Sequence, residues 1–120
     1  MQAQAQFLQS KFLQGVYAFE GRGLHRPFQL TEELYYDVPQ SKHAQLIYFR
    51  AGNSIDAMIY IVLMENGRPK RYFPIGAKAG SHVTLAITED IASGSHLEVF
   101  AAAPEQTSGW VVIDIGLMEF

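Results

Sequence analysis

The feature that most constrains the fold is the regular alternation of short apolar runs with turn-forming residues. From residue 12 onward, glycine, proline, asparagine, aspartate and serine interrupt each apolar run before it reaches the length of an ordinary helix. The most β-prone run, residues 58–64, is followed by Asn66-Gly67. That pair suits a type I′ turn, in which both central residues need positive φ. The pattern predicts an all-β protein in which residues 58–64 and 69–75 form a hairpin.

The spacing of the runs predicts about eight strands. They are expected over residues 12–19, 34–38, 44–50, 58–64, 69–75, 82–87, 97–102 and 110–119. Alternation in the last of these assigns one aliphatic face to the core, formed by Val111, Ile113, Ile115 and Leu117. Alternation in residues 82–87 does the same for Val83, Leu85 and Ile87. The predicted fold is a single-domain antiparallel β-sandwich of the jelly-roll type, and a small closed β-barrel is the alternative.

The length and the ends of the chain suit one domain inside the cell. The chain has 120 residues, and single domains cluster around ~100–150 residues. Residues 1–11 are expected to be disordered or loosely attached, and residues 12–120 to form the sandwich. There is no cysteine, no signal-peptide pattern and no apolar stretch near the ~20 residues that span a membrane. We therefore predict a cytoplasmic protein that has no membrane partner.

Charge and composition limit the classes of partner. The net charge of −3 and the pI of about 5.7 argue against nucleic-acid binding. Charged residues make up only 18% of the chain and hydrophobic residues 48%. A small protein with so few charges has difficulty covering its apolar surface. This balance predicts self-association into a homo-oligomer or docking on a protein partner.

The sequence contains no recognised catalytic motif, and we predict that the protein uses no cofactor. Serine precedes histidine at His82 and at His96, but successive strand side chains point to opposite faces, so adjacency does not make a catalytic pair. The sequence has no His-x-His and no His-Glu-x-x-His, the usual metal-binding spacings. His82 and His96 each begin a predicted strand and are weak metal candidates, with exposed strand-end histidines as the simpler interpretation. Asp114 interrupts an apolar strand and is expected on its outward face.

A cluster of basic and aromatic side chains surrounds the hairpin turn. Its members are Tyr60, Arg68, Lys70, Arg71 and Tyr72. Alternation places Lys70 and Tyr72 on one face and Arg71 on the other, so the cluster forms one basic patch only at a sheet edge or a bend. Pro69 and Pro74 favour an edge or a bulge, because proline donates no ladder hydrogen bond. Three hypotheses remain open: the basic residues protect an edge from aggregation, a guanidinium beside tyrosines binds a ligand or partner through a carboxylate or phosphate, or the basic residues form salt bridges within the protein.

Trp110 is the best candidate for an exposed ring, because it begins a strand directly after Gly109. With the tyrosines of the chain it could stack on a sugar, which is an analogy with other sandwiches only. The leading functional hypothesis is a non-catalytic binding module that associates with itself or with a protein partner. The second is a carbohydrate- or small-anion-binding module that uses Trp110 or residues 68–72. The third is an enzyme with an unrecognised site.

Overall fold

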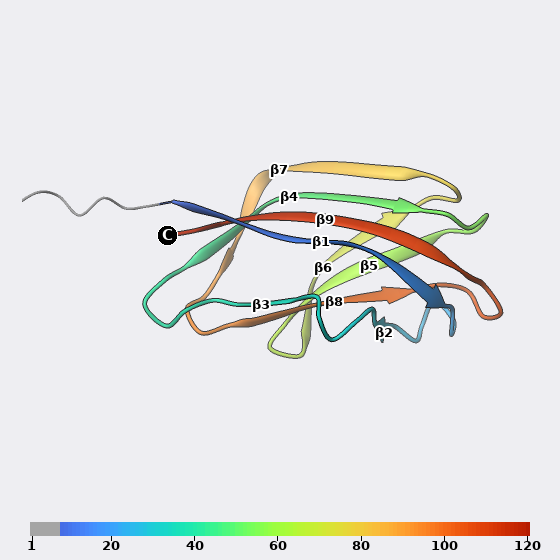
Figure 1. The fold of residues 1–120 in the computed structure, drawn as a ribbon, viewed down its shortest axis with the longest axis horizontal. Helices are drawn as coiled ribbons and strands as arrows, with labels where there is room; N and C mark the ends of the chain where they lie inside the picture. Colours follow the sequence, from blue (N-terminus) through green and yellow to red (C-terminus); the bar gives the residue numbers. More distant parts are fainter. Residues whose placement is uncertain (1–7) are drawn as a thin grey trace, which may run out of the picture.

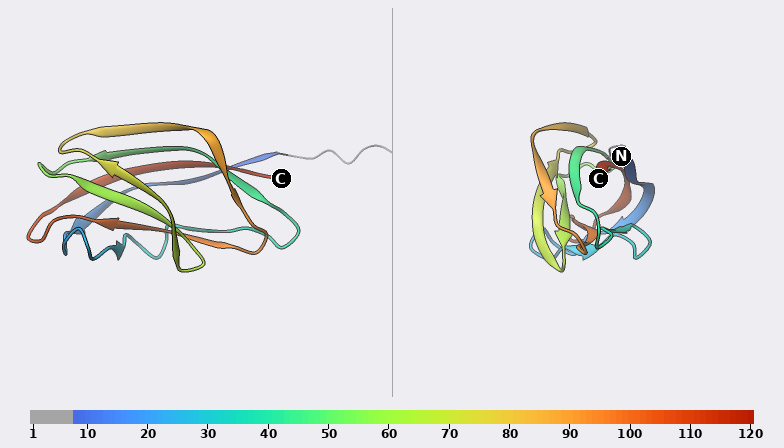
Figure 2. Two further views of the ribbon diagram at one scale, coloured as in Figure 1. Left: turned by 180° about the vertical axis from the view of Figure 1, so that it is seen from behind. Right: turned by 90° about the vertical axis from the view of Figure 1, so that its left-hand side faces the viewer.

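The computed structural model describes residues 8–120, apart from the side chains of residues 81–89. All of its strands pair antiparallel, in two sheets. Sheet A contains, in spatial order, β1 (Gln9–Glu20), β9 (Ser108–Glu119), β4 (Ala44–Asn53) and β7 (Gly80–Ile91). Sheet B contains β8 (His96–Ala102), β5 (Ile59–Glu65) and β6 (Arg68–Ile75), together with the short strands β2 (Phe28–Gln29) and β3 (Tyr35–Asp37). Figure 1 shows the four strands of sheet A side by side, and Figure 2 shows the same layers from behind and from one end.

The topology is that of a jelly roll. Strands β2 and β3 both pair with β8 and together occupy one strand position, so the nine strands among the described residues fill eight positions. The chain then passes repeatedly from one sheet to the other, which gives the orders β1-β9-β4-β7 and β2/β3-β8-β5-β6. Two Greek keys joined in this way define a jelly roll. The predicted all-β sandwich is confirmed.

The core lies between the inward faces of the two sheets. The predicted aliphatic face of β9 is buried as expected, with Val111, Ile113, Ile115 and Leu117 at most 2% exposed. Phe49 of sheet A stacks on Phe73 of sheet B with 3.9 Å between ring centroids. The predicted core residues Val83, Leu85 and Ile87 have side chains outside the described part of the chain.

The predicted hairpin joins β5 to β6. Asn66 and Gly67 have φ values of 52° and 81°, as a type I′ turn requires. Strand β6 pairs with β5 on one side only, so it forms an edge of sheet B. The pairing register skips Lys70, directly after Pro69, which makes Lys70 the residue of a β-bulge. The prolines therefore mark both an edge and a bulge, as their chemistry predicted.

Several expected boundaries differ from the structure, and two of the differences have a clear cause. Strand β1 begins at Gln9, because residues 9–11 pair with the end of β9 instead of hanging loose. Strand β7 extends to Ile91, beyond the predicted end at residue 87, because residues 89–91 pair with β4 from Leu46 to Ala44. No helix that could cross a membrane occurs in the described part of the chain.

Candidate interaction face

Large apolar side chains are exposed together on the outward side of sheet A. They are Phe12 and Val16 on β1 and Trp110 and Val112 on β9, which are 54%, 58%, 55% and 48% exposed, respectively. Their positions follow from strand alternation, because the intervening residues of both strands face the core. Trp110 is thus exposed, as its position in the sequence predicted.

The strand register arranges this surface in rows that cross β1, β9 and β4. In order along the strands, the rows are Phe12–Gly116–Tyr48, Gln14–Asp114–Arg50, Val16–Val112–Gly52 and Ala18–Trp110. Bulky apolar residues therefore lie on both sides of a single polar row. We refer to the outward side chains of these four rows as the sheet A face.

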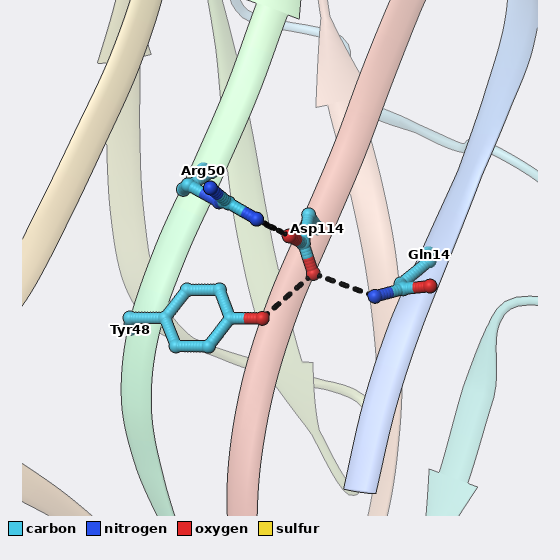
Figure 3. A network of polar contacts seen from close by, with 4 residues as sticks. All are labelled: Gln14, Tyr48, Arg50 and Asp114. Carbon is cyan, nitrogen blue, oxygen red and sulfur yellow. Dashed lines mark hydrogen bonds and ion pairs between the residues drawn. The ribbon is translucent and has the colours of Figure 1, made fainter.

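The polar row is a network centred on Asp114 (Figure 3). Oδ1 of Asp114 accepts hydrogen bonds from Gln14 Nε2 at 3.0 Å and from the Tyr48 hydroxyl at 2.9 Å. Oδ2 accepts from Arg50 Nε at 3.0 Å and from Arg50 Nη2. The donors come from β1 and β4, the two neighbours of β9, so the network ties three strands together across the sheet.

The network holds its acid and base in their charged forms. Partial burial alone would raise the pKa of the Asp114 carboxyl, but hydrogen bonds from Arg50, Tyr48 and Gln14 outweigh burial and lower that pKa. The hydrogen bond with Asp114 raises the pKa of Arg50. Burial and the hydrogen bond to Asp114 raise the pKa of the Tyr48 hydroxyl. At neutral pH the row therefore contains one carboxylate and one guanidinium, whose charges cancel locally.

Gly116 makes room for the Tyr48 ring. A Cβ atom at Gly116 would lie 2.1 Å from Cε2 of Tyr48, so the ring rests directly against the backbone of β9. The Arg50 guanidinium lies 5.5 Å from the centroid of the same ring, within cation–π range. Gly52 is different, because a Cβ there would meet only Val112 Cβ, at 3.9 Å. The face is therefore raised at Tyr48 and open at Gly52.

The predicted hairpin cluster lies on the other sheet, away from Trp110. Tyr60 and Tyr72 do come together, with 5.6 Å between ring centroids, and Tyr72 is 57% exposed. The Tyr60 hydroxyl donates to the Leu24 carbonyl at 2.8 Å. The structure therefore brings the two predicted tyrosines together, and it separates both of them from Trp110.

The basic residues of that cluster are partly engaged inside the protein. Lys70 Nζ lies 3.0 Å from Oε1 of Glu65 at the preceding strand end. Burial would raise the pKa of Glu65, but hydrogen bonding, first of all with Lys70, lowers it. Arg71 is half-buried and Arg68 is exposed beside the turn. These positions fit an edge that is blunted by proline and charge, and an anion site at Arg68 stays a prediction.

Of the two candidate metal-binding histidines, only His96 has a described side chain. The backbone of His82 is in β7, and its side chain lies outside the described part of the chain. His96 Nδ1 lies 2.5 Å from Asp37 Oδ1, and His96 Nε2 lies 3.7 Å from Glu98 Oε2. The hydrogen bond with Asp37 raises the pKa of His96, and Glu98 adds to the rise. No group of three or more metal-binding side chains occurs among the described residues.

A pocket of about 720 Å³ opens at the Trp110 end of the sheet A face. Its lining includes Trp110, Glu20, Arg22 and Phe28. The Arg22 guanidinium lies 5.6 Å from the centroid of the Phe28 ring, and Phe28 in turn stacks on Phe19 at 6.5 Å. The pocket was not predicted, because its walls come from segments whose contacts cannot be inferred from strand periodicity.

Sequence reasoning also missed the network around Asp114. The one available signal was a carboxylate in an otherwise apolar strand, which predicted an outward position but gave no partners. Gln14, Tyr48 and Arg50 lie 100, 66 and 64 residues from Asp114 in the chain. Only the order β1-β9-β4 brings them into one row.

Comparisons with known proteins add no assignment to this geometry. No protein-family model matches the chain, and no curated protein or solved structure matches it.

Proposed function

We propose that this protein is a non-catalytic binding module that associates with a second copy of itself through the sheet A face. The observation that carries the proposal is the group of four exposed apolar side chains around a charge-neutral polar row. Exposed apolar residues gathered on one surface mark interaction sites. Tryptophan, tyrosine and arginine are the residues most enriched at the energetic centres of interfaces, and Trp110, Tyr48 and Arg50 all belong to this face.

The polar row suits burial better than isolated charges would. Burying an unpaired charge has a large desolvation cost, whereas an opposite charge and hydrogen bonds offset much of that cost for a paired one. Asp114 has its donors in place within one chain, and its side chain is only 17% exposed. A partner surface therefore has to provide few polar groups to cover it.

The sheet A face is large enough to form the centre of a dimer interface. Its three strands, about 4.8 Å apart, and its four rows, about eight residues long at ~3.3 Å per residue, cover roughly 400 Å² of flat area. A standard interface buries about 800 Å² of accessible surface per partner, so the relief of the side chains and the residues flanking the face have to provide the rest.

The face is also complementary to itself. In a two-fold dimer with the axis along β9, in the plane between two stacked faces, β1 of one copy covers β4 of the other. Phe12 then meets Tyr48, Gln14 meets Arg50, and Val16 lies over the open position at Gly52. Two sheets stacked in this way pack about 10 Å apart with their strands roughly aligned. The axis also brings the two Asp114 carboxylates together, but each is already neutralised by Arg50 of its own chain.

The test is the oligomeric state, measured by analytical ultracentrifugation over a concentration series. The wild-type chain is expected to dimerise with a Kd of about 1–10 µM, ordinary for an interface of this size. Val112→Lys should weaken dimerisation at least ~100-fold, because the two-fold axis brings two ammonium groups together. Tyr72→Lys, at an equally exposed apolar position on sheet B, is the matched control and should change nothing. A wild-type chain that stays monomeric at about 500 µM, or a Val112→Lys variant that still dimerises, would refute the proposal.

The cellular location belongs to the same proposal. The chain has no cysteine, which fits a reducing compartment such as the cytoplasm. A homo-oligomer in that compartment needs neither a membrane nor a nucleic-acid partner.

A further inference from the structure

We infer that the pocket at the Trp110 end of the sheet A face binds a neutral carbohydrate. Its volume of about 720 Å³ is within the range of small-ligand sites, ~300–1,000 Å³. The residues that matter are Glu20, Arg22, Phe28, Ser108 and Trp110, all of which line it. This site does not depend on the proposed self-association, since one chain provides all of its walls.

The wall that carries Arg22 is held in place by the backbone on both sides. Gly21 N donates to the Thr107 carbonyl at 2.8 Å, and Gly23 N donates to the Ala103 carbonyl at 2.8 Å. A Cβ at Gly21 would lie 2.0 Å from the Pro104 carbonyl oxygen, so the loop packs against the β8–β9 turn as closely as backbone allows. Arg22 is thereby fixed between two anchored glycines. A pre-formed wall reduces the entropy lost when a ligand binds.

The pocket offers one exposed aromatic ring and a second that is partly covered. The Trp110 indole is 55% exposed, and its backbone is fixed by a hydrogen bond from Trp110 N to Ser54 Oγ at 2.8 Å. Phe28 is half-buried, stacked on Phe19 and covered in part by Arg22. Aromatic rings of this kind suit the C–H face of a pyranose, which is apolar while its edge carries hydroxyl groups.

The charges of the pocket select for a neutral ligand. Glu20 and Arg22 are both exposed, and neither makes an ion pair with any residue that the structure describes. Glu20 repels an anionic ligand that Arg22 attracts, and the reverse holds for a cationic ligand, so the two opposite charges together favour neither ion. A sugar hydroxyl can donate to a carboxylate while its neighbour accepts from a guanidinium, so a polyol satisfies both groups at once. Ser108 adds a hydroxyl, exposed at the start of β9.

The competing ligand is a zwitterion such as a dipeptide, whose ends would pair with Arg22 and Glu20. Ion pairs between groups this exposed contribute little to binding in water. A dipeptide without a ring would also gain little from contact with Trp110 and Phe28. The apolar rings therefore favour the sugar.

Trp110 is the sole tryptophan of the chain, so its fluorescence reports directly on this pocket. The experiment titrates maltose, cellobiose, lactose and N,N′-diacetylchitobiose into about 0.1 µM protein, well below the expected dimer Kd. Glucuronate and glycylglycine are the anionic and zwitterionic arms. Backbone amide shifts in NMR spectra locate the binding site in a second measurement. At least one disaccharide should give a saturable change with an apparent Kd of about 0.1–10 mM, the range expected for a shallow site.

Variants separate this site from general surface effects. Arg22→Ala and Glu20→Gln, at exposed positions, should each weaken disaccharide binding about tenfold or more. Arg26→Ala, at an exposed position outside the lining of the pocket, is the matched control and should leave it unchanged. The inference is overturned if no disaccharide gives a saturable change up to about 50 mM. It is also overturned if both pocket variants bind as the wild type does, or if glycylglycine or glucuronate binds more tightly than every disaccharide. A monomeric chain that binds a disaccharide would refute self-association and support this site.

Discussion

Tyr36 and Glu119 link the two sheets through a hydrogen bond inside the sandwich. Glu119 occupies the last inward position of β9 and is 4% exposed. Tyr36 lies on β3 in the opposite sheet, and its hydroxyl donates to the Glu119 carboxylate. Tyr36→Phe removes this donor and leaves a buried carboxylate without a side-chain donor among the described residues. Hydrogen bonds to charged groups contribute ~1.5–3 kcal/mol, so we expect the free energy of unfolding to fall by about 2–3 kcal/mol.

Urea unfolding followed by Trp110 fluorescence measures this loss. Tyr72→Phe is the control, since its exposed hydroxyl should contribute less than about 0.5 kcal/mol. Tyr36→Phe combined with Glu119→Leu should be more stable than Tyr36→Phe alone, because removing both partners leaves no unsatisfied charge. A Tyr36→Phe variant within about 0.5 kcal/mol of wild type, or a double variant no better than the single one, would show that the contact does not stabilise the fold.

The same pair predicts the alkaline limit of stability. Burial, and then the hydrogen bond and charge of Glu119, raise the pKa of Tyr36 above its ordinary value. The unfolded chain loses this proton near pH ~10 while the folded chain keeps it, so the contribution is complete below pH ~10 and is lost as the pH rises. The slope is at most about 1.4 kcal/mol per pH unit, and less because water still reaches part of the ring. The stability gap between wild type and Tyr36→Phe should therefore narrow above pH ~10, and a constant gap would contradict the assigned cause.

Three further predictions concern other contacts. The pKa of His96 is raised, first by its hydrogen bond with Asp37, so the contribution of this pair to the free energy of unfolding is complete below pH ~6.5 and is lost as the pH rises further. The difference in the free energy of unfolding between wild type and His96→Gln should therefore shrink between pH ~6 and ~8. The change should not exceed about 0.5 kcal/mol, because the imidazole is exposed. Gly116→Ala should displace the Tyr48 ring and cost about 1–3 kcal/mol in urea unfolding, whereas Gly52→Ala, with its nearest atom at 3.9 Å, should cost far less; equal costs would contradict the packing of Tyr48 on Gly116. A double-mutant cycle on Phe49 and Phe73 should give a coupling energy of about 1 kcal/mol, and zero coupling would mean that their stacking adds nothing beyond burial.

Local patterns predicted the parts of the fold that local physics determines. Alternation in residues 110–119 gave the correct core face, since strand side chains alternate whatever the neighbouring strand is. Asn66-Gly67 gave the hairpin, because the left-handed backbone of a type I′ turn is a property of two residues. The prolines of β6 indicated an edge because proline has no backbone N–H to donate to a second neighbouring strand.

Features that depend on strand order could not be predicted in the same way. Asp114 finds its donors only because β1 and β4 flank β9, and neither is its neighbour in the chain. Residues 88–91 lie beyond the predicted strand, and they extend β7 because β4 pairs with residues 89–91. Glu119 lies inside the sandwich because it continues the inward face of β9, and Tyr36 meets it from a three-residue strand.

Trp110 belongs both to the sheet A face and to the pocket, which makes the two proposals mutually testable. A sugar stacked on the indole would occupy surface that a second copy would cover, so each ligand should weaken the binding of the other. Linkage fixes the relation between the two effects: because the dimer has two sugar sites, a factor by which dimerisation raises the disaccharide Kd at each site must appear squared in the rise of the dimer Kd at saturating disaccharide. We expect a factor of about 5–100, the usual size of such coupling, measured by sedimentation with and without disaccharide. Trp110→Ala should weaken both processes, whereas Arg22→Ala should weaken sugar binding alone. If sugar binding and dimerisation proved independent, at least one of them would have to use a surface that does not include Trp110.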